Sequence, residues 1–378
     1  MIKYLKCFAF IFCFSLVSCE SHNIKTNESF SMTGTSTIPL QYAENFSISE
    51  FDWGYKVSVN ETKEEKQKHE VSHTFLLVRE NRTCDIKEEY PRIEIPLKRC
   101  ALNSSTYLEF LVLLGEMNTL VGLCNAEYLY NDSTYHRVET GEITQLGSIM
   151  QVNEEQLLVA NPDVLFLSDR REASSLELCP TIICTEWREP SALGRAEWIK
   201  FFALFYDKLS VADSLFRETE ARYMEVKSIA ARDTLCPTLF AAAEFGGTWY
   251  LTGGLGYMKS IYEDANARFL MADTMVGTVT TGLEWVLGRF HDAEYWMNCQ
   301  QEKKSELDDR LSLLSAYQKN RIYHFNKRSI KRPVAVISDF YESAVAHPDR
   351  ILKDVAAVLH PHLFEGYETQ YLGTLKED

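Results

Sequence analysis

The sequence lacks several arrangements that would mark an enzyme or a redox protein. No Cys-x-x-Cys pair occurs, which counts against a zinc ribbon or a thioredoxin-like site. No Gly-x-Ser-x-Gly elbow is present, and nothing assembles a nucleophile, a base and an orienting group. The glycine-rich stretch 246–256 is not a phosphate loop, because Met258 stands directly before Lys259 and Ser260, and it lacks the spacing of a dinucleotide fingerprint. We therefore expect a protein that performs no catalysis.

Positive charge is also scarce. The chain has 39 Lys and Arg residues against 54 Asp and Glu residues, a formal net charge of −15. Such a chain cannot neutralise phosphates over a broad face, so a nucleic-acid partner is excluded.

The amino terminus predicts the compartment. Lys3 and Lys6 precede an apolar core, 7–17, that is too short to span a bilayer as a helix. The stretch Leu-Val-Ser-Cys at 16–19 resembles the lipobox of bacterial lipoproteins. We predict a signal peptide over 1–19, lipidation of Cys19, and a polar tether over 20–34. The protein would then be a membrane-anchored lipoprotein on the periplasmic side of a bacterial envelope, with the membrane leaflet left open.

The cysteines after Cys19 are odd in number, so they cannot all pair within one chain. We expect mostly buried free thiols and at most one disulfide, among Cys84, Cys100, Cys124, Cys179, Cys184, Cys236 and Cys299.

Residues 35–98 carry short runs in which apolar and polar residues alternate, which predicts a β-rich section. This section contains His69, Glu70 and His73, a match to the HExxH motif of zinc metalloproteases, whose histidines share one face of a helix. Here the motif runs into a strand-like segment, which would separate the histidines by about 13 Å at ~3.3 Å per residue. A zinc-dependent hydrolase is the alternative function.

From residue 99 onward, short buried-strand runs alternate with helical segments, which predicts parallel α/β structure. This alternation of strands and helices occurs twice, over 99–209 and over 234–378. Between them, 193–233 is the longest helical signal, and we interpret it as two helices in tandem. Ser210 and Asp213 would form a capping box that opens the second helix, although a plain core helix fits the periodicity equally well.

Four motifs spread over the mature chain resemble those of substrate-binding lipoproteins of ABC importers for iron chelates and cobalamin. They are LLVANPDVLFL at 157–167, LGRAEWIKFFALFYDK at 193–208, GGTWYLTGGLGYMKSIYEDANARFL at 246–270 and DFYESAVAHPDRILKDVAAVLHPHLF at 339–364. The resemblance implies two Rossmann-like lobes, 99–209 and 234–378, joined by one long α-helix over 210–233. It also implies a ligand between the lobes, delivery to a permease dimer with its ATPase, and a monomeric protein without an intrinsic cofactor.

Ligand-contacting residues should follow the carboxyl ends of strands, where open α/β sheets bind ligands. Aromatic rings suit a large flat or macrocyclic ligand, and arginines suit the anionic oxygens of a ferric chelate, although several of these aromatics could be core residues. Two interpretations remain for Trp249 and Tyr250. They could lie in a loop that presents the rings at a cleft, or in a tight turn that buries them. The candidates are Ser104, Ser105, Tyr107, Tyr128, Tyr130, Arg170, Arg171, Trp187, Arg188, Phe245, Trp249, Tyr250, Tyr257 and Tyr341.

The resemblance further implies one acidic residue on each lobe that faces arginines of the permease. Glu172 and Glu284 are our choices. The leading function is thus capture of an iron–siderophore, haem or corrinoid for an ABC permease. Capture of a bare metal ion by His360 and His362 is a third possibility, but the segment is better explained as a helix-ending turn.

Overall fold

The computed structural model describes residues 36–60, 73–87, 89–169, 178–271 and 277–375. Several predicted features lie outside these residues: the signal peptide with Cys19, and His69, Glu70, Arg170, Arg171 and Glu172. In the part that is described, no helix has the length and apolar character needed to cross a bilayer.

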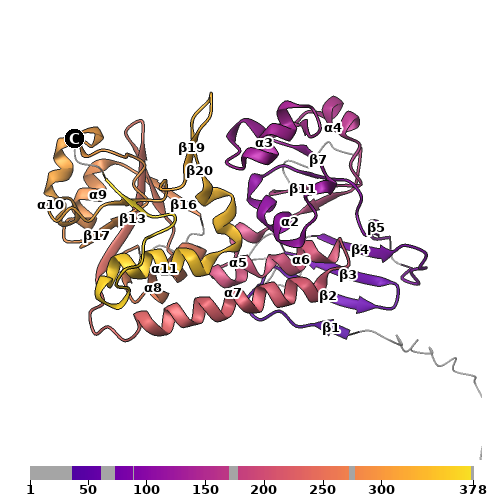
Figure 1. The fold of residues 1–378 in the computed structure, drawn as a ribbon, viewed down its shortest axis with the longest axis horizontal. Coiled ribbons are helices and arrows are strands. Elements are labelled where there is room, and N and C mark those ends of the chain that lie inside the picture. The colour runs from indigo at the N-terminus through magenta and orange to yellow at the C-terminus, as the bar shows by residue number, and fades with distance from the viewer. Residues whose placement is uncertain (1–35, 61–72, 88, 170–177, 272–276, 376–378) are drawn as a thin grey trace, which may run out of the picture. The chain divides into compact units, whose positions relative to one another are not determined.

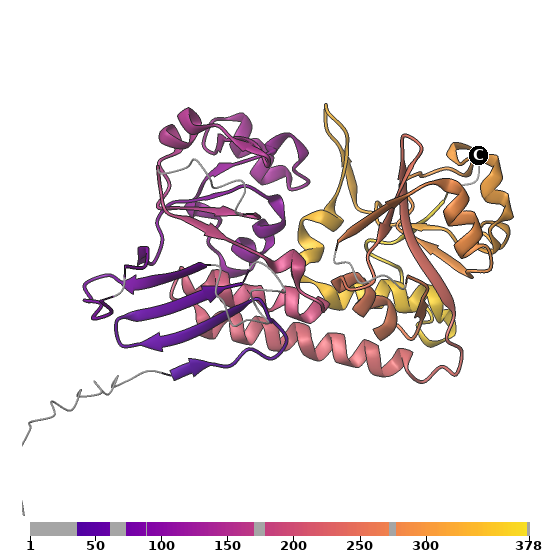
Figure 2. The ribbon, with the colours of Figure 1, turned by 180° about the vertical axis from the view of Figure 1, so that it is seen from behind.

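An amino-terminal sheet confirms the predicted β-rich section (Figure 2). Its order is β1-β2-β3-β4-β5, with antiparallel neighbours except for the parallel pair β4 and β5. Alternate side chains point into the core, where Phe46 lies 4.8 Å from the Trp198 ring and Phe75 lies 5.8 Å from the Phe205 ring. The strands are Ser36–Ile38, Phe46–Phe51, Gly54–Val59, His73–Arg79 and Arg92–Ile95.

His73 is the first residue of β4 and pairs with Val59 on β3. The second histidine of the HExxH match therefore lies in a strand, as the sequence argument anticipated. Over the described ranges, no group of three or more His, Cys, Asp or Glu side chains is arranged to hold a metal ion. The zinc-hydrolase alternative gains no support.

The first α/β section, which we define as residues 99–209, contains a five-stranded sheet with every neighbour parallel. Its order is β12-β11-β6-β7-β8, and its middle strands are buried, as parallel strands covered on both faces should be. The strands are β6 Cys100–Leu102, β7 Leu120–Leu123, β8 Thr144–Gln145, β11 Val164–Leu167 and β12 Thr181–Ile183, with a small hairpin of β9 Gly147–Ser148 and β10 Gln151–Val152. The helices are α2 Leu108–Leu114, α3 Asp132–Glu139 and α4 Glu154–Ala160.

The second α/β section, residues 234–378, holds a mixed sheet of order β15-β13-β14-β16, with β17 parallel to β13. Gly246 and Gly247 have positive φ values of 58° and 83° and form the turn between β13 and β14. The strands are β13 Thr238–Phe245, β14 Thr248–Thr252, β15 Arg268–Phe269, β16 Thr278–Thr281, β17 Tyr295–Met297, β18 Tyr323–His324, β19 Ser329–Lys331, β20 Val336–Ser338 and β21 Gly373–Thr374. The helices are α8 Tyr257–Asp264, α9 Leu283–Phe290, α10 Ser315–Gln318 and α11 Pro348–Leu359.

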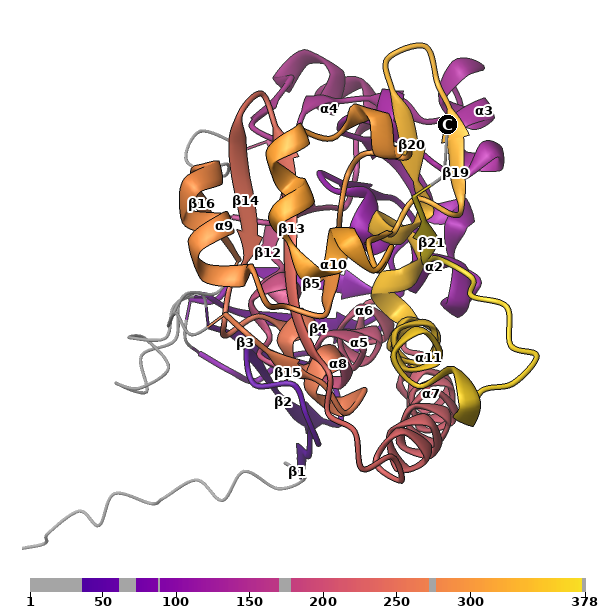
Figure 3. The same ribbon diagram turned by 90° about the vertical axis from the view of Figure 1, so that its left-hand side faces the viewer.

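Helices α5 Ala192–Ala196, α6 Trp198–Leu204 and α7 Leu209–Ala230 follow one another in the tandem segment (Figure 1). The 22 residues of α7 span about 33 Å at ~1.5 Å per residue. The buried side chains of α7 recur every three or four positions, which makes one continuous packing face: Ala212, Phe216, Thr219, Tyr223, Val226 and Ala230. Figure 3 looks nearly along α7 and shows it beside α11.

Ion pairs and hydrogen bonds tie α7 to the second section. Arg222 lies 2.6 Å from Asp349 on α11, and the Tyr223 hydroxyl donates to Asp264 on α8 at 2.8 Å. The predicted capping box is wrong, because the helix begins one residue before Ser210 and no side chain caps it. Asp213 instead lies 3.3 Å from the ammonium of Lys200 and forms an ion pair with Arg217.

All seven cysteines in the described ranges are free thiols. Cys100, Cys124, Cys184 and Cys299 are buried, Cys84 and Cys179 are half-buried, and Cys236 is exposed. The expectation of mostly buried thiols is confirmed, and the single disulfide is not found among them.

Buried carboxylates hold two extended segments against the helices. Asp354 on α11 is fully buried and accepts backbone N–H bonds from Gln370, Tyr371 and Leu372, and the Tyr367 hydroxyl. Near the amino end, Glu197 accepts the backbone N–H groups of residues 41, 42 and 43, and Glu189 accepts those of residues 44 and 45. The two segments, 41–45 and 367–372, form no helix or strand. Their paths depend on these distant carboxylates, so their own sequences do not predict them.

Candidate functional site

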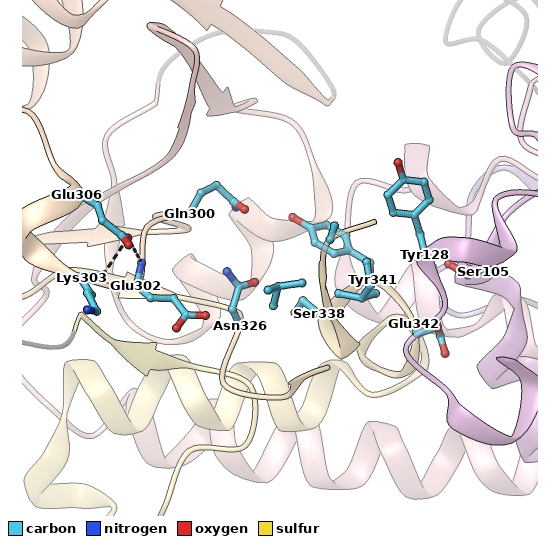
Figure 4. Close-up of a pocket in the computed structure, with 13 residues that line it drawn as sticks. Ser105, Tyr128, Gln300, Glu302, Lys303, Glu306, Asn326, Ser338, Tyr341 and Glu342 are labelled. Atoms are coloured by element: carbon cyan, nitrogen blue, oxygen red, sulfur yellow. Dashed lines mark hydrogen bonds between the residues drawn. The ribbon is translucent and has the colours of Figure 1, made fainter. Parts of the chain in front are cut away.

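A cavity of about 620 Å³ lies where the two α/β sections face each other (Figure 4). Ser105 and Tyr128 form the wall from the first section. The wall from the second section follows the ends of β17, β18 and β20, and it contributes Gln300, Glu302, Lys303, Glu306, Asn326, Ala335, Val336, Ile337, Ser338, Tyr341 and Glu342. The cavity is thus polar on the side of the second section.

A smaller cavity of about 210 Å³ is mainly aromatic and neutral. Trp187 from the first section and Tyr257, Phe325 and Phe340 from the second section line it. Tyr341 lines both cavities, so a ligand that passes this ring can contact the polar and the aromatic surfaces together.

The local structure around Tyr341 fixes its position. It ends a short 3-10 helix, Asp339–Tyr341, which begins where the Ser338 hydroxyl accepts the backbone N–H of Phe340. Phe340 stacks on Phe325 with 4.3 Å between ring centroids, and its ring meets that of Tyr341 edge to face at 5.3 Å. Figure 4 shows the Tyr341 side chain between those of Tyr128 and Asn326.

Direct contacts connect the two sections beside the larger cavity. The carboxylate of Glu342 accepts the backbone N–H groups of Tyr130 at 2.7 Å and Asn131 at 2.9 Å. From the turn between β19 and β20, Arg332 donates to the backbone oxygens of Leu129 and Tyr130, at 2.8 and 3.0 Å, and pairs with Asp132 at 2.9 Å. These contacts set the spacing of the cavity walls.

The pKa of Glu342 is raised to about 7, because burial of the carboxyl outweighs the two N–H bonds that favour its charged form. A carboxyl whose folded pKa is raised stabilises the fold most below its unfolded pKa of about 4.3, and that contribution is lost as the pH rises through about 7. As the pH rises from about 4.3 to about 7, the free energy of unfolding of the wild type should therefore fall by about 1–3 kcal/mol relative to that of Glu342→Gln.

Urea denaturation of both proteins across this pH range measures the difference. Glu365→Gln, at an exposed position after α11, is the matched control and should run parallel to the wild type. A Glu342→Gln curve that also runs parallel to the wild type would contradict the raised pKa.

The periplasmic binding protein family model matches residues 101–328, more than half of the chain. The chain belongs to the periplasmic binding protein family. This confirms the family resemblance seen in the sequence motifs. The amino-terminal sheet β1–β5 precedes the matched residues.

Known proteins resemble this periplasmic binding protein over most of its length. An uncharacterized lipoprotein of Methanocaldococcus jannaschii is 24% identical over 387 residues, which cover 93% of this chain and 89% of the relative. A periplasmic heme binding protein of Pseudomonas aeruginosa is 16% identical with a TM-score of 0.56, covering 74% of this chain and 98% of that one. An ABC-type Fe3+-hydroxamate transport system protein of Saccharomonospora viridis is 16% identical with a TM-score of 0.52, covering 70% and 94%. At such identities the two structures establish a shared fold.

Five candidates from the sequence lie at the two cavities of this periplasmic binding protein. Ser105 and Tyr128 line the larger cavity, Trp187 and Tyr257 line the smaller one, and Tyr341 lines both. They come from both sections, as a site between two sheets requires.

Other candidates do not line either cavity. The hydroxyl of Ser104 caps the turn that carries Ser105, and Tyr130 contributes backbone groups to the contacts with Glu342 and Arg332. Arg188 lies 3.6 Å from Asp169 and covers the Trp187 ring. Phe245, at the end of β13, is 78% exposed, and Tyr250 on β14 is half-exposed.

Two candidates require correction. Tyr107 is fully buried, with its ring 5.4 Å from Phe202, because the turn of residues 105–107 directs it inward. Trp249 lies in β14 rather than a loop, and its buried ring packs 5.2 Å from that of Trp296. Neither ring is available to a ligand.

The polar residues that the second section contributes to the larger cavity were not among the candidates predicted from the sequence. Gln300 comes shortly after β17, and Asn326 comes shortly after β18. The rule that loops at the carboxyl ends of strands bind ligands applies to both segments and would have identified them.

Proposed function

We propose that this protein is a lipid-anchored solute-binding protein that captures an iron–siderophore, haem or corrinoid and delivers it to an ABC permease. The two α/β sections would act as two lobes, with the cavities between them as the binding cleft. The observation that carries this proposal is that Tyr341 lines both a polar cavity of about 620 Å³ and an aromatic cavity. Residues of both sections line each of the two cavities. Such a concave, partly aromatic site suits a bulky, rigid ligand.

Helix α7 would be the strut that sets the distance between the lobes. It packs against α2 and α6 of the first section and α11 of the second, and one rigid element that contacts both sections opposes large relative rotation. Comparison of free and bound crystal structures tests this proposal, since closure by tens of degrees would contradict it.

The anchor is also a proposal. Cys19 lies outside the described residues, and the lipobox match is its support, together with the lipoprotein name of the Methanocaldococcus jannaschii relative. Mass spectrometry of the amino-terminal peptide tests it, because an unmodified Cys19 in protein from its own host would contradict lipidation. The protein would act as a monomer.

Tyr341→Ala should weaken binding of the captured ligand by about tenfold, because this ring contacts both cavities. Fluorescence titration with ferric chelates, haem and a corrinoid first finds the ligand, and the variant is then titrated with it. Tyr250→Ala is the matched control, a half-exposed tyrosine that lines neither cavity, and should bind as the wild type does. If none of the compounds binds or raises the melting temperature, the proposed function is wrong.

Glu172 and Glu284 remain our proposed contacts with the permease. Glu284 lies in the first turn of α9, its side chain is 81% exposed, and it lies 3.3 Å from Arg310. Reversing both charges to lysine should abolish uptake while ligand affinity stays unchanged, because lysines would repel permease arginines. Reversal of Glu225 and Glu365, two other exposed glutamates, should leave uptake intact. Normal uptake by the first variant would rule out this docking mode.

A further inference from the structure

Tyr262 carries a buried hydroxyl group that is not hydrogen-bonded within the protein. Its side chain is fully buried on α8, and the hydroxyl has no hydrogen-bond partner among the described residues. Buried hydroxyls almost always have a partner, because removal from water without one costs free energy. Tyr223 on α7 shows the usual arrangement, since its hydroxyl donates to Asp264 at 2.8 Å. The hydroxyl of Tyr262 is therefore a candidate for contact with a ligand.

The local structure places Tyr262 at the smaller cavity. Met258 and Tyr262 lie one turn apart on α8, so they share a helix face, and both line this cavity. The Tyr262 ring packs 5.2 Å from that of Phe269 on β15, which holds it in place. Burial raises the pKa of Tyr262, and the hydroxyls of Tyr257 and Tyr341 raise it further. Because this electrostatic effect weakens with distance, the three hydroxyls lie near one another, and all three residues line the cavity.

The raised pKa keeps the Tyr262 hydroxyl protonated at neutral pH, so this group can donate a hydrogen bond to an oxygen of a ligand. The volume of the cavity limits what can carry that oxygen. A dry cavity of about 150 Å³ can hold one benzene molecule. The smaller cavity, at about 210 Å³, therefore accommodates a single substituted ring, whereas a porphyrin or corrin, built from several linked rings, is too large to enter it. The side chains of Trp187, Phe325 and Phe340 line the cavity and suit packing against such a ring.

We propose that the smaller cavity is a subsite for one aryl arm of a metal chelate, a catechol- or phenol-type ring whose oxygen accepts a hydrogen bond from Tyr262. The metal centre of the chelate then lies in the larger cavity, beyond Tyr341, which lines both cavities. This inference rests on the proposed function and narrows its ligand class. It favours an aryl-oxygen chelate over haem, a corrinoid or a chelate without aromatic rings.

The melting temperature of the ligand-free protein tests whether the Tyr262 hydroxyl has a structural role. Tyr262→Phe keeps the ring and deletes only the unpartnered group, so this variant should melt at the wild-type temperature or above it. Tyr223→Phe is the matched control, because it deletes a buried hydroxyl that already has an acceptor in Asp264, and it should melt at a lower temperature. If Tyr262→Phe melts as low as the control, a partner in the protein or a bound water satisfies the hydroxyl, and the proposal is overturned.

Calorimetric titration tests the subsite itself, with a ferric tricatecholate and a ferric trihydroxamate that has no aromatic ring. The wild type should bind the tricatecholate more tightly than the trihydroxamate. Tyr262→Phe should weaken binding of the tricatecholate by about tenfold, because one buried hydrogen bond to the ligand is lost, and leave binding of the trihydroxamate unchanged. Tyr223→Phe should bind both chelates as the wild type does.

The outcomes separate this subsite from the proposed function. Unchanged binding of the tricatecholate by Tyr262→Phe, or an equal loss for both chelates, would overturn the subsite and leave the solute-binding function intact. The same holds if the trihydroxamate, haem or a corrinoid is the tightest ligand of the wild type. A complete absence of binding by both chelates, haem and a corrinoid would overturn the function, and the subsite with it.

Discussion

Asp354→Ala is expected to lower the free energy of unfolding by about 3–5 kcal/mol. The carboxylate is fully buried and accepts three backbone N–H groups and the Tyr367 hydroxyl, all from residues 367–372. Alanine would leave these donors without an acceptor in a buried environment, and each unsatisfied donor costs about 1–3 kcal/mol. Urea denaturation measures the loss.

The matched control is Asp292→Ala, because the Asp292 side chain is 79% exposed. That substitution should change stability by no more than about 0.5 kcal/mol. Hydrogen exchange locates the effect, since amides of residues 370–372 should lose protection in Asp354→Ala before those of the sheets. Unchanged protection there would mean that packing alone holds the segment.

Arg195→Met should also cost about 3–5 kcal/mol, because it leaves the buried Glu186 without its ion-pair partner. In the wild type, Glu186 Oε1 lies 3.3 Å from both the guanidinium of Arg195 and the hydroxyl of Thr106. Burial raises the pKa of Glu186, so the variant should recover stability as the pH falls, and the recovery should be complete below about 4.3, where the carboxyl becomes protonated in folded and unfolded chains alike.

The double variant Glu186→Gln with Arg195→Met separates charge from packing. Replacement of a whole buried pair is often close to neutral, so the double variant should be more stable than Arg195→Met alone. If the two variants are equally unstable, the lost stability comes from the packing of Arg195 under Tyr257 and not from the unpaired charge of the buried Glu186.

Much of the fold could be predicted from local sequence. Alternation in 55–59 and 74–78 identifies β3 and β4, and helical periodicity with an opening proline identifies α11 over Pro348–Leu359. These signals depend on residues a few positions apart. The same is true of α7, whose buried face is visible in the sequence.

The site was predicted less well, because the direction of a side chain depends on distant partners. Trp249 and Tyr250 are neighbours on β14, and only their pairing with β13 and β16 decides which one faces the core. Tyr107 turns inward toward Phe202, which is remote in sequence. The contact of Glu342 with Tyr130 and Asn131 joins segments more than 200 residues apart, and no local pattern announces it.

A pulling force applied to the chain ahead of residue 36 would be resisted by two parts of the protein that differ in strength. The first is β1, an edge strand of three residues that, among the described strands, pairs with β2 alone and can be peeled away one hydrogen bond at a time. The second is the segment 41–45, whose five backbone N–H groups end on the buried carboxylates of Glu197 and Glu189. The bonds of this segment would be loaded together rather than in succession, so β1 would yield first and the cavities would keep their shape.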